Sequence, residues 1–65
     1  MKINYDREVD ILRIVFAETL VDESDETKPG VILDYDSNGN IIAMEILDAS
    51  KRTEDPNRVE FAVAA

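Results

Sequence analysis

Residues 34–45 of this chain read DYDSNGNIIAME, and the stretch matches the patterns of two incompatible structures. Letter by letter, it fits the calcium-loop pattern D-x-[DN]-x-[DN]-G-x5-E, in which oxygen ligands surround an ion between two helices. By its alternation of apolar and polar residues, it is instead a pair of β-strands joined at Asn38-Gly39, a dipeptide typical of tight hairpins. The neighbouring residues must therefore distinguish a helical metal site from a β-hairpin.

The upstream residues favour the hairpin. Residues 28–33 read KPGVIL, and Pro, Gly and β-branched residues in succession make a poor helix. In a hairpin the chain runs out and back, so it does not wrap around an ion as a calcium loop does. We therefore predict strands at residues 31–36 and 40–47, joined by a type I′ turn in which Asn38 and Gly39 both have positive φ.

The length of this turn sets which side chains share a face of the hairpin. A three-residue loop ending in a Gly bulge would pair Val31 with Glu45 and Asp34 with Ile42, which mixes apolar and polar residues. A two-residue turn separates them, because facing residues share one face of a sheet. The pairs that the two-residue turn predicts are Tyr35 with Ile42, Leu33 with Met44 and Val31 with Ile46.

A second hairpin is predicted near the N-terminus, with strands at residues 2–6 and 10–17 and a loop over residues 7–10. We expect the side chains of Asp6 and Asp10 to close this loop by bonding to backbone groups. The fold class is therefore mainly β (α+β), an antiparallel meander of two hairpins. The apolar pairs of the first hairpin are Met1 with Phe16, Ile3 with Ile14 and Tyr5 with Leu12.

The remaining segments have weaker signals. Residues 18–28 are acidic and lack periodicity, so we predict a flexible acidic connector between the hairpins. Asp48 is a candidate N-cap for a short helical turn over residues 49–54. Residues 58–63 alternate apolar and polar side chains and predict a fifth strand at a sheet edge, although the Ala-rich end also fits a helical or frayed tail.

Length and composition limit what the chain can do. Its 65 residues make a single small domain, residues 1–65, that contains no Cys and no His. Disulfides, thiolate metal sites, the commonest zinc ligand and a His-based triad are therefore excluded. The N-terminus is too polar for a signal peptide, and no apolar run approaches the ~20 residues that span a bilayer. We expect a soluble, cytoplasmic protein that does not enter a membrane.

The chain is strongly acidic, with 15 acidic and 7 basic residues and a net charge of -8. Such a surface repels phosphate backbones, so we do not expect nucleic-acid binding. It suits a basic protein or divalent cations, and it also keeps a small domain soluble. Charge therefore argues against a nucleic-acid partner more clearly than it identifies a protein partner.

One face of the predicted sheet is apolar, and the short helical turn is too small to cover it. Burial of such side chains is worth about 1.5–3 kcal/mol each, against about 1–2 kcal/mol per residue for ordering the backbone, so an uncovered sheet has little net stability. We therefore expect a homodimer, or a partner protein, over this face. The predicted face consists of Met1, Ile3, Tyr5, Leu12, Ile14, Phe16, Val31, Leu33, Tyr35, Ile42, Met44 and Ile46.

Several short motifs occur together in this chain: Tyr5-Asp6 before Asp10-Ile11-Leu12, then PGVILDYD at residues 29–36, Gly39, and MEILDAS at residues 44–50. Together they resemble the domain of unknown function 2283 family over about residues 3–52. One departure is Ala43-Met44, where members often have Gly and Ile. The resemblance implies no established activity. Some members are encoded beside small ribonuclease-like toxins, which implies an antitoxin-like role for those members.

The favoured interpretation is a non-enzymatic protein-interaction module that dimerises or binds a basic partner, in an antitoxin-like role. A divalent-cation-binding protein or metal-dependent enzyme is the first alternative, because Asp34, Asp36 and Glu45 share the outer face of the predicted hairpin. A purely structural homodimer is the second alternative. The serines have no His partner, so we predict no catalytic residues and no cofactor.

Overall fold

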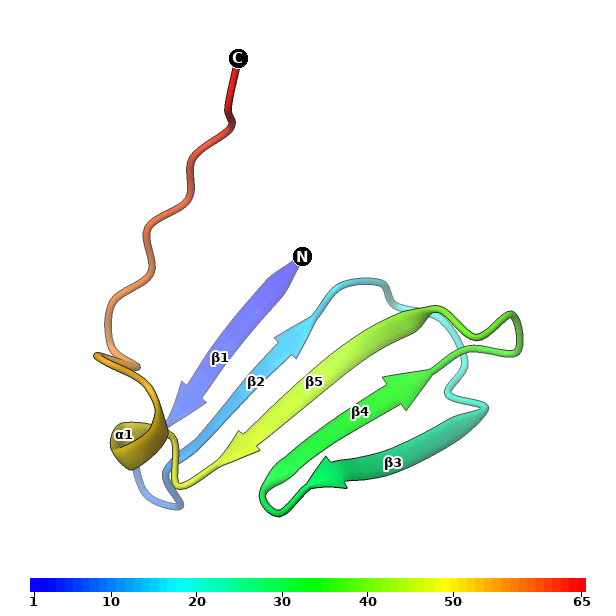
Figure 1. The fold of residues 1–65 in the computed structure, drawn as a ribbon. Helices are drawn as coiled ribbons and strands as arrows, with labels where there is room; N and C mark the ends of the chain where they lie inside the picture. The colour runs from blue at the N-terminus through cyan, green and yellow to red at the C-terminus, as the bar shows by residue number, and fades with distance from the viewer.

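The computed structural model describes residues 1–65 and consists of a five-stranded sheet, a short helix and an extended tail (Figure 1). The elements are β1 (Lys2–Asp6), β2 (Ile11–Val15), β3 (Glu23–Lys28), β4 (Val31–Tyr35), β5 (Ile41–Leu47) and α1 (Ala49–Arg52). The strand order across the sheet is β1-β2-β5-β4-β3, and every neighbouring pair is antiparallel. The mainly β, meander-like fold predicted from the sequence is confirmed.

The registers of both predicted hairpins are confirmed along most of their length. Ile3 lies opposite Ile14, and Leu33 lies opposite Met44, as the alternation predicts. The hairpins join through β2 and β5, which pair at the centre of the sheet. The other pairs on the apolar face are Tyr5 with Leu12, Leu12 with Ile46, Ile14 with Met44, and Val31 with Ile46.

The turn between β4 and β5 differs from the predicted type I′ turn. Asp36 and Asn40 enclose a three-residue loop, in which the Asp36 N–H donates to the Asn40 carbonyl at 3.0 Å and the Gly39 N–H donates to the Asp36 carbonyl at 3.1 Å. Gly39 alone has positive φ in this loop, at 82°, so the prediction for Asn38 is wrong. The chain adopts the three-residue Gly-bulge loop that the alternation disfavours.

Hydrogen bonds to the Asp36 side chain stabilise this loop. Its carboxylate accepts hydrogen bonds from the backbone N–H groups of Asn38 and Asn40, both at 2.9 Å, and from the Asn40 side-chain amide at 3.2 Å. An aspartate side chain that bonds to the backbone two residues ahead forms an Asx-turn and stabilises the loop. Alternation along the strands carries no information about these bonds, so it mispredicts the turn type.

A β-bulge in β5 corrects the shift that the longer loop introduces. Tyr35 lies opposite Ile41 instead of the predicted Ile42, and the predicted register resumes at the next pair. Ile42 is therefore the extra residue of the bulge. Its carbonyl accepts the Phe16 N–H at 2.8 Å, and its side chain is buried. The bulge thus also binds the end of β2 to β5.

The predicted connector over residues 18–28 is wrong for its second half, because Glu23–Lys28 forms the edge strand β3. β3 pairs with β4, and Asp25 lies opposite Leu33. All six residues of β3 are exposed, and charged side chains are common on edge strands, where they discourage aggregation. Apolar alternation does not predict this strand, because its pairing with β4 needs only backbone groups.

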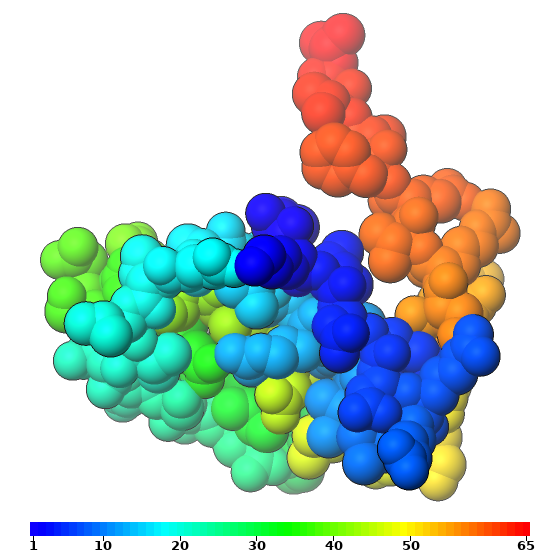
Figure 2. All heavy atoms as spheres, turned by 180° about the vertical axis from the view of Figure 1, so that it is seen from behind, coloured from blue at the N-terminus to red at the C-terminus, as the bar shows by residue number.

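Of the two elements predicted after residue 48, the structure contains the helical turn but not the fifth strand. The helical turn predicted over residues 49–54 is confirmed as α1, and Asp48 occupies the predicted N-cap position, although it has φ 53° and its side chain makes no capping hydrogen bond. Residues 58–63 form no strand, and the end of the tail projects away from the molecule (Figures 1 and 2). No helix of the chain has the length and apolar character needed to cross a membrane.

Very little of the chain is buried. The buried residues are Leu12, Ile42, Ala43 and Ala49, which belong to β2, β5 and α1. The sheet is a single layer, and the short helix α1 covers only its end (Figure 1). The side chains of the apolar face therefore pack against their neighbours in the sheet and not against a second layer.

Replacing Gly39 with Ala should destabilise the fold by about 1–2 kcal/mol, because an L side chain is strained at positive φ. The φ of Gly39 is 82°, and no atom lies within 4 Å of the position of an added Cβ, so backbone strain alone sets the cost. Urea unfolding followed by circular dichroism measures the change, with Ser37→Ala in the same loop as the control. Equal stability of Gly39→Ala and the unsubstituted chain would contradict the observed loop.

Candidate interaction surface

The apolar face of the sheet is the largest candidate site. Exposure on this face is greatest at β1, where Met1 is 77% and Ile3 is 42% exposed. A continuous apolar surface of this kind is typical of a site that binds another protein chain. The half-buried side chains of the face are Tyr5, Ile14, Val31, Leu33, Tyr35, Met44 and Ile46.

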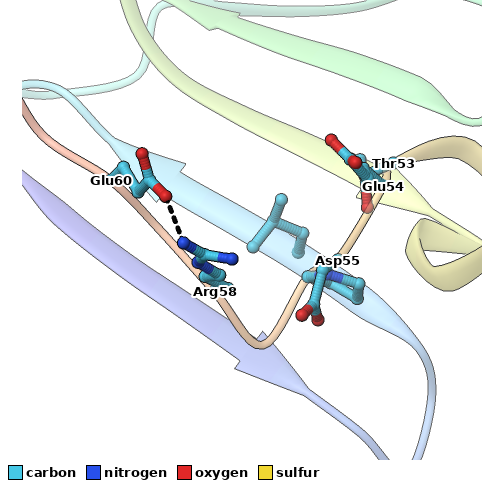
Figure 3. A pocket seen from close by; sticks show the side chains of 7 residues that line it. Thr53, Glu54, Asp55, Arg58 and Glu60 are labelled. Atoms are coloured by element: carbon cyan, nitrogen blue, oxygen red, sulfur yellow. Dashed lines mark hydrogen bonds and ion pairs between the residues drawn. The ribbon is translucent and has the colours of Figure 1, made fainter.

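An open hollow lies between this face and the start of the tail (Figure 3). Leu12 of β2 is its single apolar lining residue, and Arg58 forms an ion pair with Glu60 at its rim. The other lining residues are Thr53, Glu54, Asp55 and Pro56. Small-molecule sites are mostly apolar and enclosed, so the hollow is better described as the gap under the tail than as a ligand pocket.

The opposite face of the sheet brings together two of the three carboxylates that are candidate ligands under the cation-binding alternative. Arg13 in β2 lies opposite Glu45 in β5. Its guanidinium is 3.1 Å from the Glu45 carboxylate and 3.5 Å from the Asp34 carboxylate. Asp34 also accepts a hydrogen bond from the Ser24 hydroxyl at 2.7 Å. The cluster therefore links β2, β5, β4 and β3 through side chains on the polar face.

Asp36, the third predicted carboxylate, lies apart from this cluster in its own loop. The backbone N–H and then the side-chain amide of Asn40 hold the pKa of Asp36 below its usual value, because both stabilise the ionised carboxylate. No three His, Cys, Asp or Glu side chains converge on a point that could hold a metal ion. The chain therefore matches the calcium-loop pattern in sequence but not in structure, because the strands β4 and β5 flank the loop.

A third polar cluster, centred on Asp10, is absent from the sequence-based predictions. The Asp10 carboxylate accepts the hydroxyls of Tyr5 and Ser50, both at 2.6 Å, and the Ser50 backbone N–H at 2.9 Å. Asp6 closes the β1–β2 loop as predicted, by accepting the Glu8 N–H at 3.0 Å. Asp10 does not bond to that loop through its side chain. Instead, it binds α1 to the first hairpin.

These bonds fix the protonation of the Asp10 cluster. The Ser50 hydroxyl, followed by the Tyr5 hydroxyl, holds the pKa of Asp10 below its usual value, because both donate to the carboxylate. The hydrogen bond to Asp10 raises the pKa of Tyr5, because a neighbouring carboxylate favours the protonated hydroxyl. Both shifts favour the same arrangement at neutral pH, with Asp10 ionised and Tyr5 protonated.

A family model described as "Protein of unknown function (DUF2283)" matches residues 2–50 of the chain. The chain belongs to the DUF2283 family. No curated protein and no solved structure matches it. The match covers all five strands and ends within α1, so the DUF2283 region includes the Asp10 cluster and the Arg13 cluster, while the tail lies outside it.

Two features of this DUF2283 domain escape prediction from its sequence. The bond between Asp10 and Ser50 joins residues 40 positions apart, which no local pattern connects. The strand β3 lacks an apolar pattern, because all six of its residues are polar and exposed.

Replacing Asp10 with Asn should reduce the amount by which the free energy of unfolding decreases as the pH falls. Because the folded pKa of Asp10 is lowered, its contribution is present above the pKa of the unfolded chain and is lost as the pH falls through the folded value. Asn tolerates the positive φ of Asp10, 58°, so the substitution does not strain the backbone. It removes the titrating group together with one of the two oxygens that accept hydrogen bonds.

Urea unfolding between about pH 2 and pH 7 measures this effect. We expect a shallower acid dependence for Asp10→Asn, with Asp36 supplying part of the remaining slope. Asp25→Asn, on the exposed strand β3, is the control with the same charge change. Identical acid slopes for Asp10→Asn and the unsubstituted chain would contradict the role assigned to the cluster.

Proposed function

We propose that this protein is a non-enzymatic interaction module that forms a homodimer and binds a basic protein partner. One observation carries the proposal: a single-layer sheet presents an apolar face, and only four residues of the chain are buried. Sheets normally bury an apolar face against another layer. A second copy is the simplest such layer, because two-fold homodimers are the commonest assemblies of soluble proteins.

The charge distribution supports a basic partner. The net charge is -8, and the exposed edge strand β3 carries Glu23, Asp25 and Glu26. The outer side of β3 has no neighbouring strand, so its backbone groups are free to pair with a strand of another protein. A basic segment would complement both the open edge and the negative charge.

An antitoxin-like role in the cytoplasm is the more specific form of this proposal. Ribonucleases hold the phosphates of RNA with basic side chains, and an acidic strand against such a site would neutralise it and exclude RNA. Glu23 and Asp25 suit this role, because neither pairs with a cation of its own chain. Their charge is therefore available to a partner.

The cation-binding alternative gains no support from the positions of its candidate ligands. Arg13 lies between Asp34 and Glu45 and balances their charge. The Asp36 carboxylate is bonded within its own loop. A purely structural homodimer differs from the proposal only in lacking the basic partner, and substitutions on β3 separate the two.

Sedimentation velocity over a dilution series tests the homodimer. We expect a two-chain species that dissociates only at high dilution, because a second copy supplies the layer that the sheet lacks. Leu33→Glu, in the middle of the apolar face, should shift the equilibrium towards monomer. Leu20→Glu, at a side chain 91% exposed, should not. A folded monomer at every concentration would overturn the proposed homodimer.

Co-expression with the protein encoded by the neighbouring gene tests the basic partner, because the proposal expects that protein to be small and basic. The two should co-purify, and the complex should weaken as salt rises. Glu23→Gln combined with Asp25→Asn should weaken binding by about tenfold or more. Glu8→Gln combined with Glu54→Gln removes the same charge elsewhere and should have a smaller effect. A neighbouring gene that encodes no basic protein, or binding indifferent to salt and to the β3 substitutions, would rule this partner out.

A further inference from the structure

The C-terminal tail, residues 58–63, has the sequence of a strand but pairs with no strand. It reads RVEFAV, with apolar side chains at every second position, which is typical of a strand with one buried face. Val59, Phe61 and Val63 are 58%, 82% and 78% exposed, and no backbone hydrogen bond links residues 59–63 to another segment. The tail therefore leaves both its backbone groups and its apolar side chains without partners.

The edge strand β1 of the same chain is incomplete in the same way. Its side away from β2 has no neighbouring strand, so the backbone groups there are free to pair. Met1 and Ile3, at this edge, are 77% and 42% exposed. The tail runs roughly antiparallel to β1 (Figures 1 and 3). Its direction therefore suits antiparallel pairing with this edge.

One contact sets both the direction and the register of such pairing. The side chain of Arg7, directly after β1, donates to the amide oxygen of Asn57, directly before the tail, at 2.9 Å. The tail therefore starts at the C-terminal end of β1, and only an antiparallel course lets it follow the strand. With Arg7 opposite Asn57, Asp6 lies opposite Arg58, which is a favourable pair of charges. The apolar pairs of this register are Tyr5 with Val59, Ile3 with Phe61 and Met1 with Val63.

A turn before the tail holds its start in place. The Asp55 carboxylate accepts the Asn57 N–H at 3.0 Å, and the Asp55 carbonyl accepts the Arg58 N–H at 3.1 Å. Pro56 occupies the second position of this turn, where its fixed φ is favourable. The turn is bound to Arg7 in the β1–β2 loop. It is therefore the fixed end about which the rest of the tail can move.

The side chains of the tail already point in the directions that pairing requires. Arg58 and Glu60 line the hollow above Leu12 and point towards the sheet (Figure 3). Val59 and Phe61 alternate with them and are exposed, so they point away from the sheet on the side of its apolar face. Pairing in this register places the two apolar side chains on the apolar face and the two charged ones on the opposite face. The tail therefore reaches the β1 edge by a sideways shift, without rotation about its own axis.

We infer that the tail is a strap that closes onto β1 of its own chain as a sixth, antiparallel strand, and that the observed structure is its open form. A segment of six residues spans about 20 Å, enough to follow the whole of β1. Closure pairs the free backbone groups of this edge and reduces the exposure of apolar side chains on both segments. It leaves β3 as the single free edge of the sheet, which is the edge proposed for the basic partner. The inference does not depend on the homodimer, because the strap and β1 belong to one chain.

Amide hydrogen exchange followed by NMR tests closure. In the open form no amide of residues 59–63 has a backbone acceptor, so all of them exchange at the rate of an unfolded peptide. Closure predicts that every second amide of this segment exchanges about tenfold more slowly or more, because an antiparallel edge strand bonds through alternate residues. Phe61→Asp should abolish this protection, whereas Ala64→Asp adds the same charge outside the paired segment and should retain it. Free exchange throughout residues 59–63 of the native chain overturns the inference.

Disulfide formation within one chain tests the register, because the chain contains no Cys of its own. Three variants combine Asn4→Cys with Arg58→Cys, Glu60→Cys or Ala62→Cys, and each is oxidised at high dilution. The inferred register brings the Cβ atoms of residues 4 and 60 within disulfide reach. The Glu60→Cys variant should therefore close about tenfold faster or more than the other two, because pairing raises the local thiol concentration. Fastest closure at residue 58 or 62 overturns the register, and disulfide-linked dimers overturn pairing within one chain.

These results are independent of the sedimentation test of the homodimer. A chain that dimerises but has a freely exchanging tail overturns the strap and leaves the homodimer intact. A monomeric chain with a protected tail overturns the homodimer and supports the strap.

Discussion

The antiparallel pairing of β2 with β5 is the interaction on which the rest of the structure depends. It is the strand pairing that joins the first hairpin to the other three strands. A hairpin alone is marginally stable in water, and a stable sheet needs three or more strands with a shared apolar face. By placing Leu12 opposite Ile46, the pairing aligns the apolar residues of both hairpins on one face. Asp10 strengthens this junction, because it binds α1 to the loop that precedes β2.

A single layer built in this way presents surfaces of different chemistry. One face is apolar and has no covering layer, while the other carries Arg13 between two carboxylates. The two edges differ as well, because β3 carries three acidic residues and β1 only one. Each proposed contact uses a different surface: the second copy uses the apolar face, and the basic partner uses β3. The two forms of binding are therefore compatible in one assembly.

Alternation predicts the strands and most of the register of both hairpins, because a slip of one residue would move every apolar side chain to the other face. It does not predict the loop after β4, whose geometry depends on the Asp36 carboxylate, or β3, which pairs through its backbone. The same limit applies to the polar clusters. The placement of Asp34 and Glu45 around Arg13 follows from residues that share a face. The Asp10 cluster does not, because it depends on how the end of β5 meets the first hairpin.

The account depends on another chain covering the apolar face. The accessibility of methyl groups to a soluble paramagnetic probe, measured by NMR at concentrations where the chain is assembled, tests this most directly. In the isolated chain Ile3 on the apolar face is 42% exposed, and Val9 in the β1–β2 loop is 57% exposed. The account predicts that the probe attenuates the Ile3 methyl signals far less than those of Val9. Similar attenuation at both residues would contradict it.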